Sequence, residues 1–191
     1  MIITSKDSFI MSNLKPQILS PKFFDRSVLE VAEEIIGKFM VREIDHQITR
    51  VMINEVEAYD GPQDLACHAR HGQTQRNKAL YGDPGHYYVY LCYGMHWLMN
   101  IVTGPKKFPS ALLIRGVIHG QKTVNGPGKV TKLLKVDKSF NMQPATQKTG
   151  LWFEDHGVNV NKQDVLRCPR IGVDYAGPEW SQKPYRFLLK K

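Results

Sequence analysis

The feature that most restricts the fold is a pair of strand-like runs joined by almost no intervening chain. Residues 86–92 (HYYVYLC) and 95–102 (MHWLMNIV) are separated only by Tyr93-Gly94. Two residues between strands predict a tight hairpin turn, which glycine favours. A second pair of runs, KFMVREID and ITRVMINEVEAYD, meets around Asp45-His46-Gln47. Strands connected this closely are antiparallel neighbours, so a mainly antiparallel sheet is predicted.

Helical patterns are fewer and shorter. The apolar spacing in DRSVLEVAEEIIGKFM predicts an amphipathic helix that Asp25 or Ser27 caps and Gly37 ends. Further helices are predicted in NGPGKVTKLLKV and, as two short pieces, in PQDLACHAR and TQRNKALY, whereas ALLIRGVIH, GLWFED, VLRCPRIGV and PYRFLLK are predicted strands. The predicted fold class is therefore α+β: a single domain with a curved, mainly antiparallel sheet, flanking short helices and a protruding β-hairpin.

Composition limits the classes of partner and compartment. The chain has 191 residues, and 26 Lys and Arg against 18 Asp and Glu give a net charge of +8, which suits a polyanion such as nucleic acid. Cys67, Cys92 and Cys168 form no CxxC pair, so free thiols in a reducing cytosol are expected instead of a zinc site or disulfides. The start of the chain does not have the pattern of a secretory signal, and no run reaches the about 18 apolar residues of a membrane span, so no membrane partner is expected. Residues 1–19 are expected to be a flexible segment and residues 20–191 one domain.

Carboxylates directly follow an apolar strand in NEVEAYDGPQDLACHARHG, residues 54–72. Strand alternation predicts that Glu55, Glu57 and Tyr59 share one face with Val51 and Ile53. A carboxylate on such a face is either solvated at the rim of the sheet or partly desolvated, and desolvation would raise its pKa and make it a better proton acceptor. The strand pattern alone leaves both alternatives open.

Three motifs in order carry a resemblance to a known family. EVEAYDGPQDLACHARHGQTQRN, YVYLCYGMHWLMN and GPGKVTKLL resemble the alkyladenine (3-methyladenine, or methylpurine) DNA glycosylases, of the mammalian type that bacteria also have. The resemblance runs from about Ser20 to the C-terminus. It implies a monofunctional base-excision-repair enzyme that flips alkylated purines out of double-stranded DNA, with deaminated and etheno purines as further candidates, and hydrolyses the N-glycosidic bond. No cofactor or metal, a monomer and, for a bacterial protein, a cytoplasmic nucleoid-associated location are expected.

The resemblance also implies site residues. Glu57 matches the residue that activates water, and no lysine lies in its motif, so an abasic product is expected. The other residues are expected to contact the base or the DNA. Tyr59, His68, Tyr90, Asn100 and Leu113 are expected in a base-binding pocket, and Tyr93 as the DNA-intercalating wedge. Arg115 and Lys129, which lies at the start of the predicted helix NGPGKVTKLLKV, are expected to bind phosphates. Without the resemblance, His68 could be structural, Tyr93 a turn residue, Arg115 the partner of a carboxylate and the helix lysines plain solvated charges. The 104–109 loop has a length of its own.

Two other functions remain open at this stage. A non-catalytic module could stack nucleic acid on exposed tyrosines, without any use of Glu57. A metal-dependent nuclease or phosphatase could use the carboxylates of residues 55–64 with His68, because Asp64 and His68 would share one face of a helix.

Overall fold

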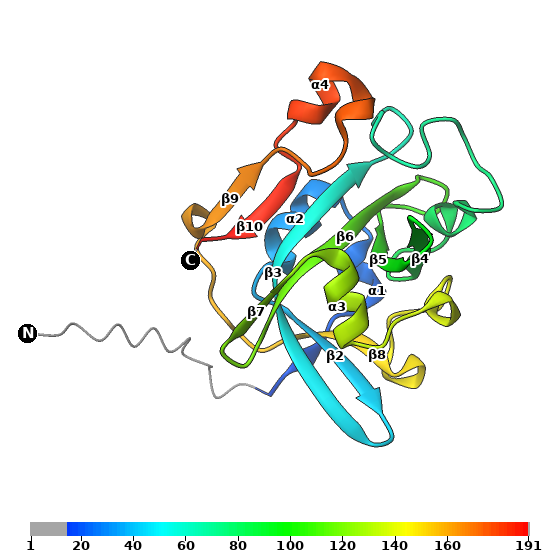
Figure 1. The fold of residues 1–191 in the computed structure, drawn as a ribbon. Helices are drawn as coiled ribbons and strands as arrows, with labels where there is room; N and C mark the ends of the chain where they lie inside the picture. Colours follow the sequence, from blue (N-terminus) through cyan, green and yellow to red (C-terminus); the bar gives the residue numbers. More distant parts are fainter. Residues whose placement is uncertain (1–14, 191) are drawn as a thin grey trace, which may run out of the picture.

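The computed structural model describes residues 15–190, which form the mixed α+β arrangement of Figure 1. The strands in this range are β1 (Gln17–Ile18), β2 (Phe39–Ile44), β3 (Gln47–Asp60), β4 (Tyr87–Cys92), β5 (His96–Thr103), β6 (Ser110–His119), β7 (Lys122–Asn125), β8 (Leu151–Asp155), β9 (Val165–Cys168) and β10 (Arg186–Leu189). The helices are α1 (Pro21–Phe24), α2 (Val28–Ile35), α3 (Pro127–Leu133) and α4 (Gly177–Gln182), with 3₁₀ turns η1 (Lys78–Tyr81), η2 (Lys138–Phe140), η3 (Gln147–Thr149), η4 (Lys162–Asp164) and η5 (Asp174–Ala176).

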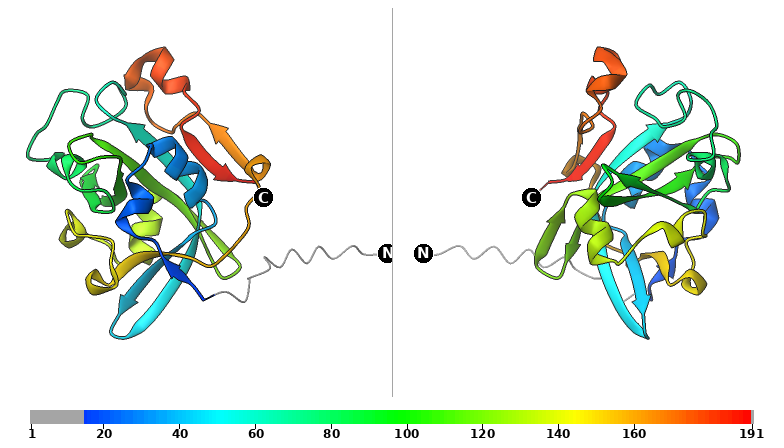
Figure 2. Two further views of the ribbon diagram at one scale, coloured as in Figure 1. Left: turned by 180° about the vertical axis from the view of Figure 1, so that it is seen from behind. Right: turned by 45° about the vertical axis from the view of Figure 1, so that its right-hand side comes forward.

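All strands of the described chain join one sheet, and each pairing is antiparallel. The main order is β1-β8-β2-β3-β6-β5-β4, while β7 pairs with β6, and β10 pairs with both β3 and β9. Helix α2 lies behind the sheet and α3 in front of it in Figure 1, and the rear view in Figure 2 reverses their order. The predicted fold class, including the hairpin that β4 and β5 form at Tyr93-Gly94, is confirmed.

Helix α2 forms where the apolar spacing predicts it. Val28, Val31, Ala32 and Ile35 are all buried against the sheet, and each larger aliphatic side chain contributes about 1.5–3 kcal/mol through its burial. The helix ends before Gly37, whose φ of +85° is the left-handed conformation that glycine adopts without strain.

The predicted helix in PQDLACHAR is wrong, because residues 62–70 form a series of turns. Asp64 accounts for the difference: its side chain accepts hydrogen bonds from the amides of Asp60 (3.0 Å) and Ala66 (2.9 Å). An aspartate that binds nearby amides offers the backbone an alternative to the helix. The next piece, TQRNKALY, is helical only over the 3₁₀ turn η1.

Strand β3 reverses its faces at an irregularity in its pairing with β6. Ile53 lies opposite Val117 and Val56 opposite Ile114, but Glu55 between them lies opposite Gly116, so each strand shifts its register by one residue. A bulge of this kind changes which side chains point to the core. Val51 and Ile53 before it and Val56 and Ala58 after it all belong to the main core. The prediction that Glu55, Glu57 and Tyr59 share a face with Val51 and Ile53 is therefore wrong.

The N-terminal segment predicted to be flexible, residues 1–19, lies mainly outside the described residues. Within its described part, Gln17 and Ile18 form β1 and pair with Asp155 and Glu154 of β8. Across residues 15–190, no helix has the length and apolar character needed to cross a membrane.

Candidate active site

One cleft of about 830 Å³ contains every site residue selected from the sequence. These nine residues line it together: Glu57, Tyr59, His68, Tyr90, Tyr93, Asn100, Leu113, Arg115 and Lys129. They come from β3, β4, β5, β6, α3, the loop after β3 and the turn between β4 and β5, so the fold brings together segments that are up to about 70 residues apart. Their roles remain predictions, but their convergence is a property of the structure. The 104–109 loop is not part of this lining, and Lys106 within it pairs with Asp83 (3.1 Å).

The floor of the cleft is a row of side chains across the sheet. Four residues on neighbouring strands lie side by side in this row: Glu57 of β3, Leu113 of β6, Asn100 of β5 and Tyr88 of β4. Residues directly opposite one another in antiparallel strands point to the same face, so these four side chains meet in the cleft. The adjacent row, Ala58, Leu112, Ile101 and Tyr87, points the other way into the main core.

Glu57 lies at this floor with no exposed surface. Its Oε1 accepts a hydrogen bond from the Ile171 amide (2.7 Å), and its Oε2 accepts one from the Tyr59 hydroxyl (3.0 Å). Burial raises the pKa of Glu57, and Arg115, the Ile171 amide and Tyr59 each oppose that rise. The carboxylate is thus a stronger base than an exposed glutamate, while two donors hold its orientation.

Arg115 lies between two carboxylates. Its Nε is 3.2 Å from Glu55 Oε1 and 3.4 Å from Glu57 Oε1, and the Glu55 oxygen also accepts a hydrogen bond from Arg186 (3.1 Å). Pairing with a carboxylate, the alternative that the sequence leaves open for Arg115, is therefore found. Because the arginine still lines the cleft, contact with a DNA phosphate stays a prediction.

Aromatic side chains form the cleft wall beside Glu57. The Tyr88 and Tyr90 ring centroids lie 5.2 Å apart, and the His68 and Tyr90 rings form a T-shaped contact with centroids 4.7 Å apart. His68 Nδ1 is 2.9 Å from the Tyr88 hydroxyl. Desolvation, with Arg76 and Arg70 nearby, lowers the pKa of His68 to about 4, so its imidazole is neutral near pH 7. A neutral ring beside tyrosine faces suits an aromatic ligand, including a cationic one.

The rim of the cleft carries an exposed aromatic residue and a lysine. Tyr93 is 90% exposed at the tip of the β4–β5 hairpin, with a φ of +50°. The ring is therefore accessible to a ligand outside the cleft, and its role as a wedge stays a prediction. Lys129 is exposed on α3 across the rim.

The carboxylates proposed for the alternative metal site have other partners. Asp64 forms a bidentate ion pair with Arg170 (2.5 and 2.8 Å), and Glu55 pairs with two arginines. Because residues 62–70 are turns, Asp64 and His68 do not share a helical face. In residues 15–190, three or more His, Cys, Asp or Glu side chains do not converge in a way that could hold a metal ion.

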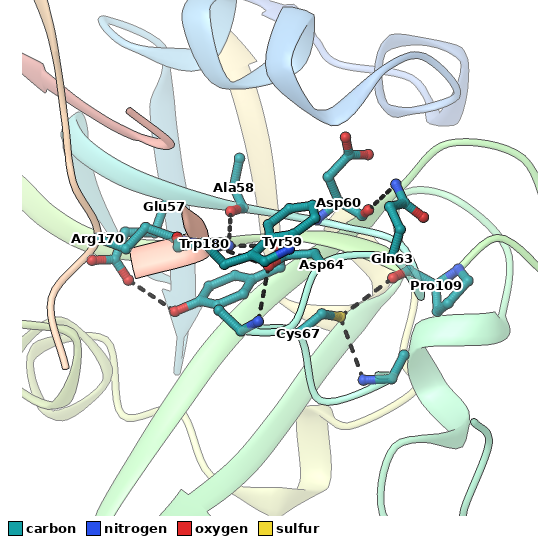
Figure 3. A network of polar contacts seen from close by, with 12 residues as sticks. Glu57, Ala58, Tyr59, Asp60, Gln63, Asp64, Cys67, Pro109, Arg170 and Trp180 are labelled. Atoms are coloured by element: carbon teal, nitrogen blue, oxygen red, sulfur yellow. Dashed lines mark hydrogen bonds and ion pairs between the residues drawn. The ribbon is translucent and has the colours of Figure 1, made fainter. Parts of the chain in front are cut away.

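Sequence reasoning missed the segment that holds Glu57 in place. Residues 169–173 follow β9 and bring the Arg170 side chain and the Ile171 amide to the end of β3, as the polar network in Figure 3 shows for Arg170, Tyr59 and Asp64. Glu57 and Ile171 are 114 positions apart. No local pattern could have indicated such a contact, and a main-chain donor leaves no trace in residue type.

Comparison with known proteins agrees with this site. A family model described as methylpurine-DNA glycosylase (MPG) matches residues 22–191. A putative 3-methyladenine DNA glycosylase of Methanocella arvoryzae is 39% identical over 91% of this chain and 92% of its own length. The DNA-3-methyladenine glycosylase of Arabidopsis thaliana is 38% identical over 93% of this chain and 74% of its own length.

The chain therefore belongs to the methylpurine-DNA glycosylase family, which confirms the resemblance found in the three motifs. It is a hydrolase that acts on N-glycosyl bonds, of the 3-methyladenine DNA glycosylase type. A binding module without catalysis does not fit this membership.

Proposed function

We propose that this protein is a monofunctional DNA glycosylase of base-excision repair. It flips an alkylated purine out of duplex DNA into the cleft and hydrolyses the N-glycosidic bond, which leaves an abasic site. The observation that carries the proposal is Glu57, a buried carboxylate at the floor of a cleft whose wall is Tyr59, His68 and Tyr90. A base inside the DNA stack cannot reach a group at such a floor, so the target nucleotide has to leave the stack.

Glu57 supplies the base for the hydrolytic step. Its carboxylate accepts a proton from water as that water attacks the anomeric carbon of the deoxyribose. The bond from this carbon to the purine nitrogen breaks, its electron pair leaves with the base, and the sugar keeps the hydroxyl. A purine alkylated on a ring nitrogen is cationic and leaves as a neutral molecule. The sugar carries oxocarbenium character during this step, which the negative charge of Glu57 stabilises.

The cleft wall selects the base. Tyr59 and Tyr90 stack on its two faces, which contributes about 1–3 kcal/mol per base, and a cationic base gains about 0.5–2 kcal/mol more from electron-rich rings. Asn100 crowds the exocyclic amine of guanine in the proposed pocket. This role is supported by its burial (4% exposed) and by the hydrogen bond that its amide nitrogen donates to the Tyr88 carbonyl (3.1 Å). Leu113 completes the floor beside Glu57.

The rim binds the duplex. Tyr93 enters the minor groove and fills the gap that the flipped nucleotide leaves, while Arg115 and Lys129 contact phosphates beside it. One chain supplies all of these groups, so the proposed active form is a monomer. For a bacterial protein, the proposed location is the cytoplasm, at the nucleoid.

The test is base release from duplex oligonucleotides that each carry one defined lesion, with wild type beside Glu57→Gln. Wild type is expected to release the damaged base and to leave strands that break only after alkaline treatment. Glu57→Gln keeps the shape of the side chain but cannot accept the proton, so release should fall by about 100-fold or more while the variant still binds the duplex. Undiminished release by Glu57→Gln would overturn the proposed role of this carboxylate. Strand breaks before alkali would contradict a monofunctional enzyme.

A further inference from the structure

A buried ion pair lies directly behind the cleft wall. The side chains of Asp64 and Arg170 have no exposed surface, and two hydrogen bonds of 2.5 and 2.8 Å join the guanidinium to the carboxylate. The same guanidinium donates to the Ala58 carbonyl (2.8 Å), and Asp64 also accepts the amides of Asp60 and Ala66. The pair thus fixes the end of β3, the loop that follows it and the segment after β9 against one another (Figure 3).

Neither residue of the pair lines the cleft, but Arg170 lies directly behind one residue that does. The Arg170 guanidinium carbon lies 4.8 Å from the centre of the Tyr59 ring and 5.2 Å from that of Tyr185. Arg170 is outside the cleft lining, whereas Tyr59 is part of it. The cation therefore covers the protein side of Tyr59 and leaves the cleft side open. The residue after Arg170 is Ile171, whose amide holds Glu57 Oε1.

We propose that Arg170 and Asp64 are positioning and specificity-determining residues for the flipped base. Arg170 orients Tyr59 and, through Ile171, the Glu57 carboxylate. Asp64 neutralises the guanidinium behind the stacking ring, so that the open face of Tyr59 accepts a positively charged purine. This inference rests on the proposed function and adds to it a control over the charge of the substrate.

The electrostatic part follows from distance. A base stacked on the open face of Tyr59 would lie about 8 Å from the guanidinium carbon. An uncompensated unit charge at that separation, at the dielectric of a protein surface, would weaken binding of a cationic base by about 10- to 30-fold. A neutral base would feel almost none of this repulsion. Neutralisation by Asp64 therefore matters for alkylated, cationic purines far more than for neutral lesions.

The test compares two lesions in the same duplex sequence. One substrate duplex carries 7-methylguanine, which is cationic. The other substrate duplex carries a neutral purine lesion at the same position, hypoxanthine or ethenoadenine. Base release is measured as kcat/KM for wild type, Asp64→Asn, Arg170→Lys and the double variant Asp64→Asn/Arg170→Met, each checked for folding by thermal unfolding. The quantity of interest is the ratio of kcat/KM for the cationic lesion to that for the neutral lesion.

Asp64→Asn leaves the guanidinium without its counter-charge, so the ratio should fall by about 10- to 30-fold. The double variant removes both charges and should restore the ratio, even where its overall rate is low. Arg170→Lys keeps the charge pair but loses the bidentate geometry, so kcat should fall for both lesions with the ratio unchanged. If Asp64→Asn does not fold, Arg170→Met carries the test, because the uncompensated Asp64 should raise the ratio.

A purely structural pair would lower both rates together. An unchanged ratio in the folded Asp64→Asn protein, or in Arg170→Met where that variant replaces it, would therefore overturn the inference. The proposed function is judged separately, by release from wild type and its loss in Glu57→Gln.

Discussion

Glu57 is held in an unusual balance between burial and hydrogen bonding. Burial alone would favour the protonated acid, while Arg115, the Ile171 amide and the Tyr59 hydroxyl favour the carboxylate. Since catalysis in the proposed mechanism needs the ionised form, activity should fall as the pH drops through the pKa of Glu57, and this acid limb should lie above the usual pKa of 4.5.

Tyr59→Phe tests this balance at the scale of one hydroxyl. The variant keeps the stacking ring but removes the 3.0 Å hydrogen bond to Glu57 Oε2. Loss of a donor that favours the charged form raises the pKa of Glu57 further, so the acid limb of the rate profile should move to higher pH. The measurement is single-turnover base release from about pH 4 to pH 9.

Tyr88→Phe is the matched control. Its hydroxyl bonds to His68 and has no contact with Glu57, so the variant should leave the position of the acid limb unchanged. An acid limb that stays in place in Tyr59→Phe, or moves equally in both variants, would show that Glu57 does not control it.

At the scale of elements, the paired shift in β3 and β6 is what turns Glu57 toward the cleft. Without it, strand alternation from Val51 and Ile53 would place Glu57 in the main core. Gly116 makes the shift possible, because a Cβ there would lie 2.7 Å from Asn54 Oδ1 and 2.9 Å from Glu55 Cβ.

Gly116→Ala should therefore be damaging for both stability and activity. The added methyl group has to push Asn54 and Glu55 aside, which should destabilise the fold by about 1–3 kcal/mol. Because Glu55 holds Arg115 beside Glu57, base release by the folded fraction should also fall. Chemical denaturation and release assays measure the two effects.

Gly82→Ala is a suitable comparison, because neither Gly82 nor Gly116 has a positive φ. A Cβ added at Gly82 would have one neighbour within 4 Å, the Ala79 carbonyl oxygen at 3.1 Å. Its effect should be smaller, and its release rate per folded molecule unchanged. Equal losses in both variants would contradict a special role for the shift.

The elements that could be predicted are those with strong local signals. The β4–β5 hairpin and α2 follow from turn residues and apolar spacing within one segment. The turns of residues 62–70 and the reversal in β3 could not be predicted in this way, because they depend on Asp64, on Arg170 and on a partner strand about 60 positions away. Most of the site residues lie in the three motifs, and Leu113 and Arg115 were assigned through the same family resemblance, whereas the partners that orient them come from distant segments.

At the scale of the whole molecule, the main core and the candidate active site lie on opposite faces of one sheet. One face buries α2 and the main core, and the other carries the cleft and its rim of Tyr93 and Lys129. The net charge of +8 would attract any polyanion, and the cleft rim presents the exposed Lys129 beside the proposed base pocket. DNA affinity should therefore depend on which lysine is removed, not only on the total charge.

Lys129→Gln tests this at the scale of the whole surface. Each phosphate contact releases counterions, so the logarithm of the binding constant should fall linearly with the logarithm of salt concentration, with a slope near −0.9 per contact. Removal of the Lys129 contact should weaken binding to damaged and undamaged duplexes alike, and should make the slope shallower by about 1. Fluorescence anisotropy between about 50 and 200 mM salt measures it.

Lys22→Gln is the control, because it makes the same change in net charge on α1, outside the cleft lining. The salt slope of Lys22→Gln should differ from that of wild type by much less than the change of about 1 expected for a lost phosphate contact. The reason is that exposed charges farther apart than about 10 Å are screened at 0.1 M salt. If the salt slope becomes shallower by the same amount in both variants, binding follows total charge and Lys129 has no specific contact. If the slope becomes shallower only in Lys129→Gln, the duplex lies across the α3 side of the rim.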